Sequence, residues 1–211
     1  MMIAVQERRE LVGRVLRAST TGFDCGTRGS RIDERHVFGS FVRVPIAEDG
    51  SMYALGLIYA IRIDDDPLAR ELVMASIVDN SALLDQRENR MVPVEIAVIN
   101  VGYAQHGEII HALPPRPPLS LSEVELCQAE EIYAFTQSFE YFRLIISASE
   151  VPSDELLAAA IRCAAQIYPN DRDPARSERY QFLVRSGRKL ATLLSHDLKR
   201  LSRVLALIKP R

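Results

Sequence analysis

A run of three aspartates at residues 64–66 is the part of the sequence that comes nearest to a metal-binding motif. Together with Asp79 or Glu95, it could supply the oxygen ligands that Mg²⁺ prefers in proteins. The same run has a structural explanation, because Asp66 precedes Pro67 and can cap a helix that begins at that proline. Capping accounts for these residue types without a metal, so we predict no metal site and no cofactor.

Patterns typical of catalytic sites are missing from the sequence. The histidines fall outside any Gly-x-Ser-x-Gly or His-Glu-x-x-His arrangement, and they are His36, His106, His111 and His196. A phosphate-binding loop needs two glycines followed by Lys-Ser or Lys-Thr, and the nearest fragment, Ser186–Leu190, lacks the first glycine and the final hydroxyl. We therefore predict a non-catalytic chain. An enzyme whose site forms between the barrel and the helices, such as a metal-dependent nuclease that uses the aspartate run, stays open as an alternative.

The strongest candidate for binding is the basic end of the chain. Residues 175–211 carry ten Lys and Arg against two Asp and Glu, whereas residues 1–174 carry 16 basic and 26 acidic side chains. Such an asymmetry indicates an interaction surface, or two parts of one molecule that attract each other. The candidate residues for binding nucleic acid or a protein partner are Arg185, Arg188, Lys189, Lys199, Arg200 and Arg203.

These cations fall mostly off an apolar stripe, which predicts that they face solvent while the stripe packs inward. The stripe consists of Leu190, Leu194, Leu198, Leu201, Leu205 and Ile208. DNA phosphates or an acidic protein could bind such a surface. The alternatives are a solvated helix face and a helix that docks on the acidic remainder of the chain. The apolar stripe could equally bind a partner helix.

Length and composition describe an ordinary globular protein. The chain has 211 residues, 47% apolar and 26% charged, enough for one large or two small domains. Its N-terminus lacks a secretory signal, and no apolar run approaches the roughly 20 residues that span a bilayer. We therefore expect a cytoplasmic protein without membrane contact. Cys25, Cys127 and Cys163 are widely spaced and are expected to be reduced.

Alternating apolar residues predict a β-rich first half. The clearest period of two covers Tyr53–Ile63, where the odd positions are bulky and the even positions are mostly small. Further strands are expected over Val12–Thr20, Phe23–Cys25, Phe38–Ile46 and Val92–Val98, with Ile109–Leu113 as a hairpin partner after Gly107. The proline-rich segment at residues 114–118 is expected to end this region in an extended form.

The second half reads as three helices. Ser122 and Glu125 have the spacing of a capping box and precede a stripe that runs from Ile132 to Ile146. A second helix is expected from Ser153 to Ile167, because Pro169 follows it. The third is expected to run without a break from Asp173 to Ile208.

Three short glycine and apolar motifs suggest a family. They are Val12–Val15, Phe38–Val44 and Gly56–Tyr59. Across roughly residues 10–115 the chain resembles the HAS-barrel family, the small barrel shared by HerA-type DNA translocases and the catalytic ring of ATP synthase. The resemblance implies a barrel that packs side by side in a ring and is usually followed by a P-loop ATPase domain. This chain departs from the family by lacking that P-loop.

The sequence therefore predicts an α+β protein. Residues 1–118 form a HAS-like β-barrel domain with one inserted helical segment, and residues 119–211 form a helical domain of about three helices with a basic C-terminal helix. The expected function is that of a non-catalytic assembly or adaptor module. By the resemblance, its partner would be a ring ATPase or a DNA-processing complex, or the chain would act as an assembly factor for an ATP synthase-type ring. DNA contact through the basic helix and homo-oligomerisation are further expectations.

Overall fold

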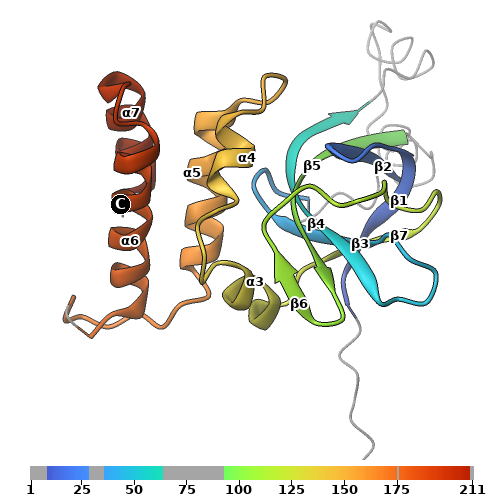
Figure 1. Ribbon diagram of the computed structural model, residues 1–211, viewed down its shortest axis with the longest axis horizontal. Helices are drawn as coiled ribbons and strands as arrows, with labels where there is room; N and C mark the ends of the chain where they lie inside the picture. Colours follow the sequence, from blue (N-terminus) through green and yellow to red (C-terminus); the bar gives the residue numbers. More distant parts are fainter. Residues whose placement is uncertain (1–8, 29–35, 64–92, 175, 210–211) are drawn as a thin grey trace, which may run out of the picture.

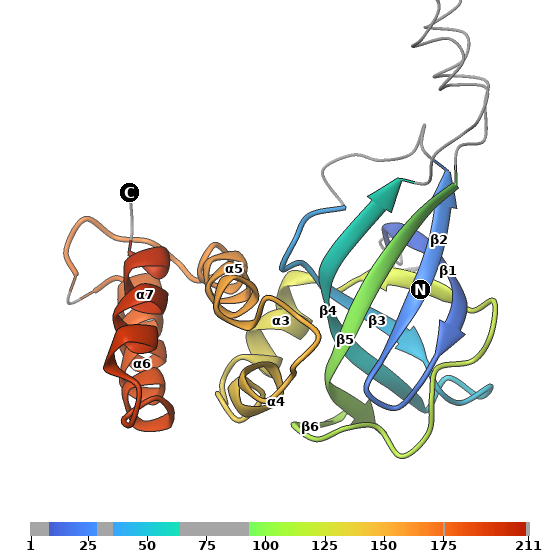
Figure 2. The same ribbon diagram turned by 90° about the horizontal axis from the view of Figure 1, so that it is seen from above.

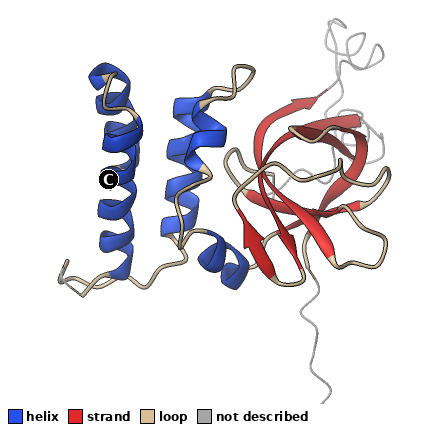
Figure 3. Ribbon diagram, in the orientation of Figure 1, coloured by secondary structure: helices blue, strands red, loops and turns tan. Residues whose placement is uncertain are grey.

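The computed structural model describes residues 9–28, 36–63, 93–174 and 176–209. Strands gather on one side of the molecule and helices on the other (Figure 3). The predicted α+β class is thereby confirmed, with a barrel that precedes several helices. The aspartate run at residues 64–66 and the helix expected after it lie outside the described residues.

Six antiparallel strands close into a barrel (Figure 2). Around the barrel the order is β1, β7, β3, β4, β5 and β2, and β2 pairs again with β1. A seventh strand, β6, extends the free half of β5 through a tight turn at His106 and Gly107, both of which have positive φ. The strands are β1 (Leu11–Ala18), β2 (Gly22–Arg28), β3 (Phe41–Pro45), β4 (Met52–Ile63), β5 (Pro93–Gln105), β6 (Glu108–Ile110) and β7 (Glu123–Leu126).

The predicted strands are therefore present, with one correction. The segment at residues 122–125 was expected to open a helix, but residues 123–125 instead belong to β7, which inserts between β1 and β3. The proline-rich segment at residues 114–118 does not end the β-region. It leads across the barrel to Leu119 and Leu121, whose backbone amides donate to the carbonyls of Pro45 and Val15. The barrel thus takes its closing strand from beyond the boundary predicted at residue 118.

Strand β4 uses its two faces differently. Leu55 and Leu57 point out of the barrel and belong to a core shared with the helices. Ala54 and Ile58, at even positions, belong to the core inside the barrel. A register shift between Ile58 and Ala60 then places Ile61 against the inner core, because a one-residue slip moves a side chain to the other face.

Five helices follow the barrel as two successive layers (Figure 1). Helices α3, α4 and α5 lie next to the barrel, and α6 and α7 lie outside α5. None of these described helices is long and apolar enough to cross a bilayer. They are α3 (Ala129–Phe135), α4 (Phe142–Ile146), α5 (Ser153–Ala165), α6 (Glu178–Leu193) and α7 (Leu198–Ile208).

Two of the three predicted helices are interrupted. The stripe from Ile132 to Ile146 is divided between α3 and α4, with Phe139 in the connecting segment. The first of these helices, α3, begins later than predicted. At its start the Glu131 carboxylate accepts a hydrogen bond from the backbone amide of Gln128 at 2.9 Å. The last helix is also divided, and only the second, α5, matches its predicted extent closely.

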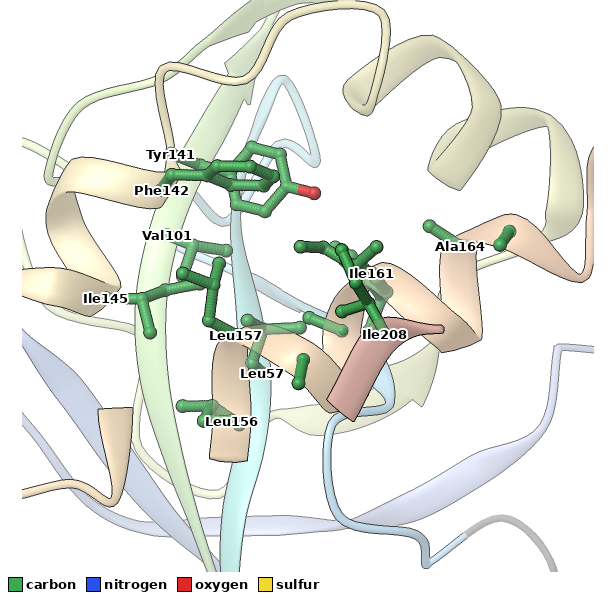
Figure 4. Close-up of a cluster of buried hydrophobic side chains, with 14 of the residues drawn as sticks. Leu57, Val101, Tyr141, Phe142, Ile145, Leu156, Leu157, Ile161, Ala164 and Ile208 are labelled. Atoms are coloured by element: carbon green, nitrogen blue, oxygen red, sulfur yellow. The ribbon is translucent and has the colours of Figure 1, made fainter. Parts of the chain in front are cut away.

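Helices and barrel share one apolar core (Figure 4). Leu57 on β4 and Val101 on β5 contribute from the barrel, and they meet side chains from α4, α5 and α7. The labelled helical side chains include Phe142, Ile145, Leu156, Leu157, Ile161 and Ile208, all of which are buried. Burial of this size holds the helical part against the outside of β4 and β5, so the two parts present their surfaces in a fixed relation.

Candidate interaction surface on the helical hairpin

Helices α6 and α7 form a hairpin that carries all six cations predicted to bind a partner. The chain turns at residues 194–197, where the Asp197 carboxylate caps α7 by accepting from the amide of Arg200 at 2.9 Å. Leu205 of α7 lies against Gly187 of α6, which is the contact expected when α7 folds back along α6. The predicted single helix was wrong here, because a side-chain cap at Asp197 competes with helix continuation.

The predicted apolar stripe is correspondingly broken. Leu190, Leu194 and Ile208 are buried, whereas Leu198 is 68% exposed and Leu205 is 37% exposed. Val204, which was not part of the stripe, is fully buried. Helix α7 therefore turns a different face to the core, with Val204 and Ile208 one helical turn apart.

Three of the six predicted cations are bound within the chain. Lys189 Nζ lies 2.6 Å from Glu140 Oε1, in the segment between α3 and α4. Arg200 donates through Nε to the Asp154 carboxylate and through Nη2 to Ser153 Oγ, the latter at 2.6 Å. Arg203 Nη1 lies 3.4 Å from the other oxygen of Asp154. The alternative that the basic segment docks on acidic parts of the chain thus holds for these three.

The other three cations face solvent. Arg185, Arg188 and Lys199 are exposed, and none has a carboxylate partner among the residues that the structure describes. The Arg185 guanidinium lies 6.0 Å from the centre of the Phe139 ring, a distance at which a cation–π contact is weak. Among the six candidate residues, these three side chains supply unpaired positive charge on the hairpin.

Apolar side chains are exposed on the same hairpin. Leu198 and Leu205 lie on α7, and Tyr180, 49% exposed, lies near the start of α6. The sequence did not single out this combination, because the continuous-helix interpretation placed both leucines in the core. The hairpin therefore offers cationic and apolar groups together.

Arginines on the barrel are paired with carboxylates. Arg14 Nη2 lies 2.5 Å from Glu123 Oε1 on the neighbouring strand. Arg17 donates to Asp24 and to Glu95 on two different strands. These pairs reduce the positive charge that the described part of the barrel can offer to a phosphate group.

At the base of the helical part, Glu131 forms a compact ionic junction. Its two carboxylate oxygens lie 2.5 Å from Arg43 Nη1 and 2.6 Å from Arg9 Nη1. The Arg43 guanidinium also stacks on Tyr53, 3.7 Å from the ring centre. Burial alone would raise the pKa of Glu131, but the hydrogen bonds from Arg9, Gln128 and Arg43 outweigh it and hold the pKa below its usual value.

Two of the four histidines, His36 and His111, lie within hydrogen-bonding distance of backbone carbonyl oxygens. His36 is buried with Nε2 3.0 Å from the carbonyl oxygen of Val12. His111 Nε2 lies 2.8 Å from the carbonyl oxygen of Phe135, and burial lowers the pKa of this imidazole. Within the described ranges, no three His, Cys, Asp or Glu side chains gather as metal ligands.

A closed six-stranded barrel whose outer apolar core is shared with the helices defines the architecture. No model of a known protein family matches the chain, and no curated protein sequence matches it either.

Proposed function

We propose that the chain is a non-catalytic assembly or adaptor protein that uses the α6–α7 hairpin to bind an acidic face of a protein partner. The observation that carries this proposal is the exposure of Arg185, Arg188 and Lys199 without carboxylate partners in the described part of the chain. Nearby cations such as Lys189 and Arg200 are neutralised internally. Free positive charge at a few positions suits a complementary acidic surface.

Exposed apolar side chains favour a protein over DNA as the partner. Leu198, Leu205 and Tyr180 would remain in water on a surface that binds only phosphates. Protein interfaces combine apolar and aromatic side chains with arginine. DNA binding depends instead on the number of phosphates neutralised, and the three unpaired cations among the six candidates would give a salt dependence with a slope of only about 3. DNA is retained as an outcome of the test.

The resemblance to HAS barrels supplies the class of partner. It supports a ring ATPase of a DNA-processing complex as the assembly to which this barrel would attach. An ATP synthase-type ring is the alternative that the same resemblance supports. Both are assemblies of proteins, and the same experiment separates them.

The test is affinity purification of the tagged chain from its native cells, with nuclease treatment and identification by mass spectrometry. Two double variants are compared with the wild type. R185A/R188A removes two free cations from α6, and R116A/R172A removes two exposed cations elsewhere, which makes it a matched control. We expect a ring-forming ATPase to be recovered with the wild type and the control, and to be lost with R185A/R188A.

Two results would overturn the proposal. Recovery of the same partner with R185A/R188A would show that the hairpin cations are not the contact. Loss of the partner on nuclease treatment, together with direct binding of a labelled duplex that weakens in R185A/R188A, would assign the hairpin to DNA instead. Recovery of ATP synthase subunits would retain the adaptor function and change the partner class.

A further inference from the structure

A cleft of about 590 Å³ lies between the end of the barrel and the segment that joins α4 to α5. One wall is formed by the β1–β2 turn, with Ser19 and Thr21, together with Tyr59 on β4. The opposite wall is formed by residues 147–151, and Leu113 and Leu144 add apolar surface. The volume lies in the range typical of small-molecule sites. The hairpin cations do not contribute to this cleft.

Asn100 on β5 lines the cleft and is fully buried. Its Nδ2 donates to the carbonyl oxygens of Ser19 and Thr20, at 3.5 Å and 3.1 Å, which fixes the orientation of the amide. The other amide atom, Oδ1, has no hydrogen-bond partner among the described residues. A buried acceptor left unpaired is costly, so this oxygen is a place where a hydrogen-bond donor would be stabilised.

The charged residues around the cleft also favour a ligand that donates hydrogen bonds. Arg17 is the cation of the lining, and it is held by Asp24 and Glu95. Glu150 lines the cleft from the other wall, is exposed, and has no ion pair within the described ranges. Burial raises the pKa of the Tyr59 phenol; among the nearby charges, Asp24 and Glu150 raise this pKa, and Arg62 and Arg17 lower it.

We propose that this cleft binds a small organic cation, a primary amine carried on an apolar body. The ammonium group would donate to Asn100 Oδ1 and pair with Glu150, and the apolar body would lie against Leu113, Leu144 and the Tyr59 ring. An anion of the same size would meet the unpaired carboxylate of Glu150 with like charge, so the site discriminates by the sign of the ligand's charge.

Phenethylamine and 3-phenylpropionate test this proposal, because they have similar apolar bodies and opposite charges. Each is titrated into the ¹⁵N-labelled full chain while NMR signals are followed. We expect phenethylamine to shift the side-chain amide signals of Asn100 and the backbone signals of residues 19–22 and 147–151 along a saturable curve. We expect 3-phenylpropionate to bind at least tenfold more weakly.

Three variants locate the site. E150Q should weaken phenethylamine binding about fivefold, as expected for one partly exposed ion pair. E48Q removes one exposed carboxylate that does not line the cleft and should leave the affinity unchanged. S149W places a large ring on the cleft wall from an exposed position and should abolish binding.

The proposal is overturned if both ligands bind equally, if the anion binds more tightly, or if neither shifts the Asn100 signals at millimolar concentration. It is also overturned if E48Q weakens binding as much as E150Q does, because the effect would then be one of overall charge. Binding of phenethylamine that survives in S149W would place the ligand elsewhere.

Discussion

Arg43 on β3 and Glu131 on α3 connect the barrel to the helical part through a charged contact of 2.5 Å. Both side chains are 18% exposed, and Arg9 holds the second carboxylate oxygen of Glu131. The contact lies at the edge of the apolar core in which Ile132 and Phe135, from the same helix, are buried. It therefore fixes the position of α3 at the point where the chain leaves the barrel.

Glu131 should make stability depend on pH below neutrality. Its pKa is lowered in the folded protein from an ordinary value of 4.5, so its contribution is complete above about pH 5 and is lost as the pH falls through the folded pKa. E131Q should reduce the free energy of unfolding by about 2 kcal/mol at pH 7. Urea denaturation at pH 7, 5 and 3.5 should show the difference from wild type shrinking with acidity.

E123Q is the control for this prediction, because the pair of Glu123 with Arg14 is more than half exposed. It should change the free energy of unfolding by less than about 1 kcal/mol. A difference between E131Q and wild type that is the same at every pH would contradict the assignment.

Gly39 should resist substitution because it is both strained and crowded. Its φ is +88°, and a Cβ at this position would lie 2.5 Å from the Cβ of Ala159 on α5. G39A should therefore lower the free energy of unfolding by about 3 kcal/mol. Gly50 has φ +69° with open space around it, so G50A should lose only the conformational part, about 1 kcal/mol. Thermal unfolding of both variants measures the difference, and equal losses would contradict the close contact with α5.

Removing either of two buried hydroxyl groups in the shared core should change the stability of the protein in opposite directions. Tyr141 Oη has no hydrogen-bond partner among the described residues, whereas Thr136 Oγ1 lies 2.7 Å from the Ile132 carbonyl oxygen and 2.9 Å from Tyr168 Oη. Y141F should be neutral or stabilising by up to about 1 kcal/mol, because an unpaired polar group leaves the core. T136V should destabilise by about 1–2 kcal/mol, because Tyr168 loses a partner. Chemical denaturation tests both variants, and a destabilised Y141F would indicate a partner for that hydroxyl.

Replacing Arg200 and replacing Arg188 should have different effects on the stability of the protein, although both residues were predicted to bind a partner. Arg200 pairs with Asp154, which is 8% exposed on α5, whereas Arg188 is exposed without an ion pair in the described part of the chain. R200A should lower the free energy of unfolding by about 1–2 kcal/mol, since Asp154 keeps only the longer contact with Arg203. R188A should change it by less than about 0.5 kcal/mol. The melting temperatures of R200A and R188A test this prediction. Equal values would contradict a structural role for Arg200.

Strands were easier to predict from the sequence than helix boundaries. The alternation predicted from Tyr53 onward is visible in the sequence because the two faces of β4 are buried in different cores. It ends at the register shift after Ile58, beyond which Ile61 packs in the inner core and Ile63 is exposed. Strand β7 was missed because four residues are too few to show a period, and because Ser122 and Glu125 also have the spacing of a capping box. Its identity depends on pairing with β1 and β3, which are distant in sequence.

The sequence identified the basic residues of the candidate surface, but it did not predict which of them face solvent and which are paired within the chain. A count of basic residues identifies the α6–α7 region, but it does not distinguish Arg188, which faces solvent, from Arg200, which is held by Asp154. The polar residues 195–197 were the available signal for the turn, with Asp197 three residues before the amide that it caps. Asn100 gave no signal, because an asparagine within an apolar strand shows neither its burial nor its partners.

The place of β7 between β1 and β3 has a consequence for biosynthesis. During translation, β1 has no partner on one side until residues 123–126 have left the ribosome. The first five strands of the barrel can form a curved open sheet before then, with the edges of β1 and β3 unpaired. Closing a loop of this length is slow compared with forming the neighbouring hairpins. The nascent chain therefore passes through an open state in which two strand edges are exposed, and chaperone binding or premature pairing between chains would act at that stage.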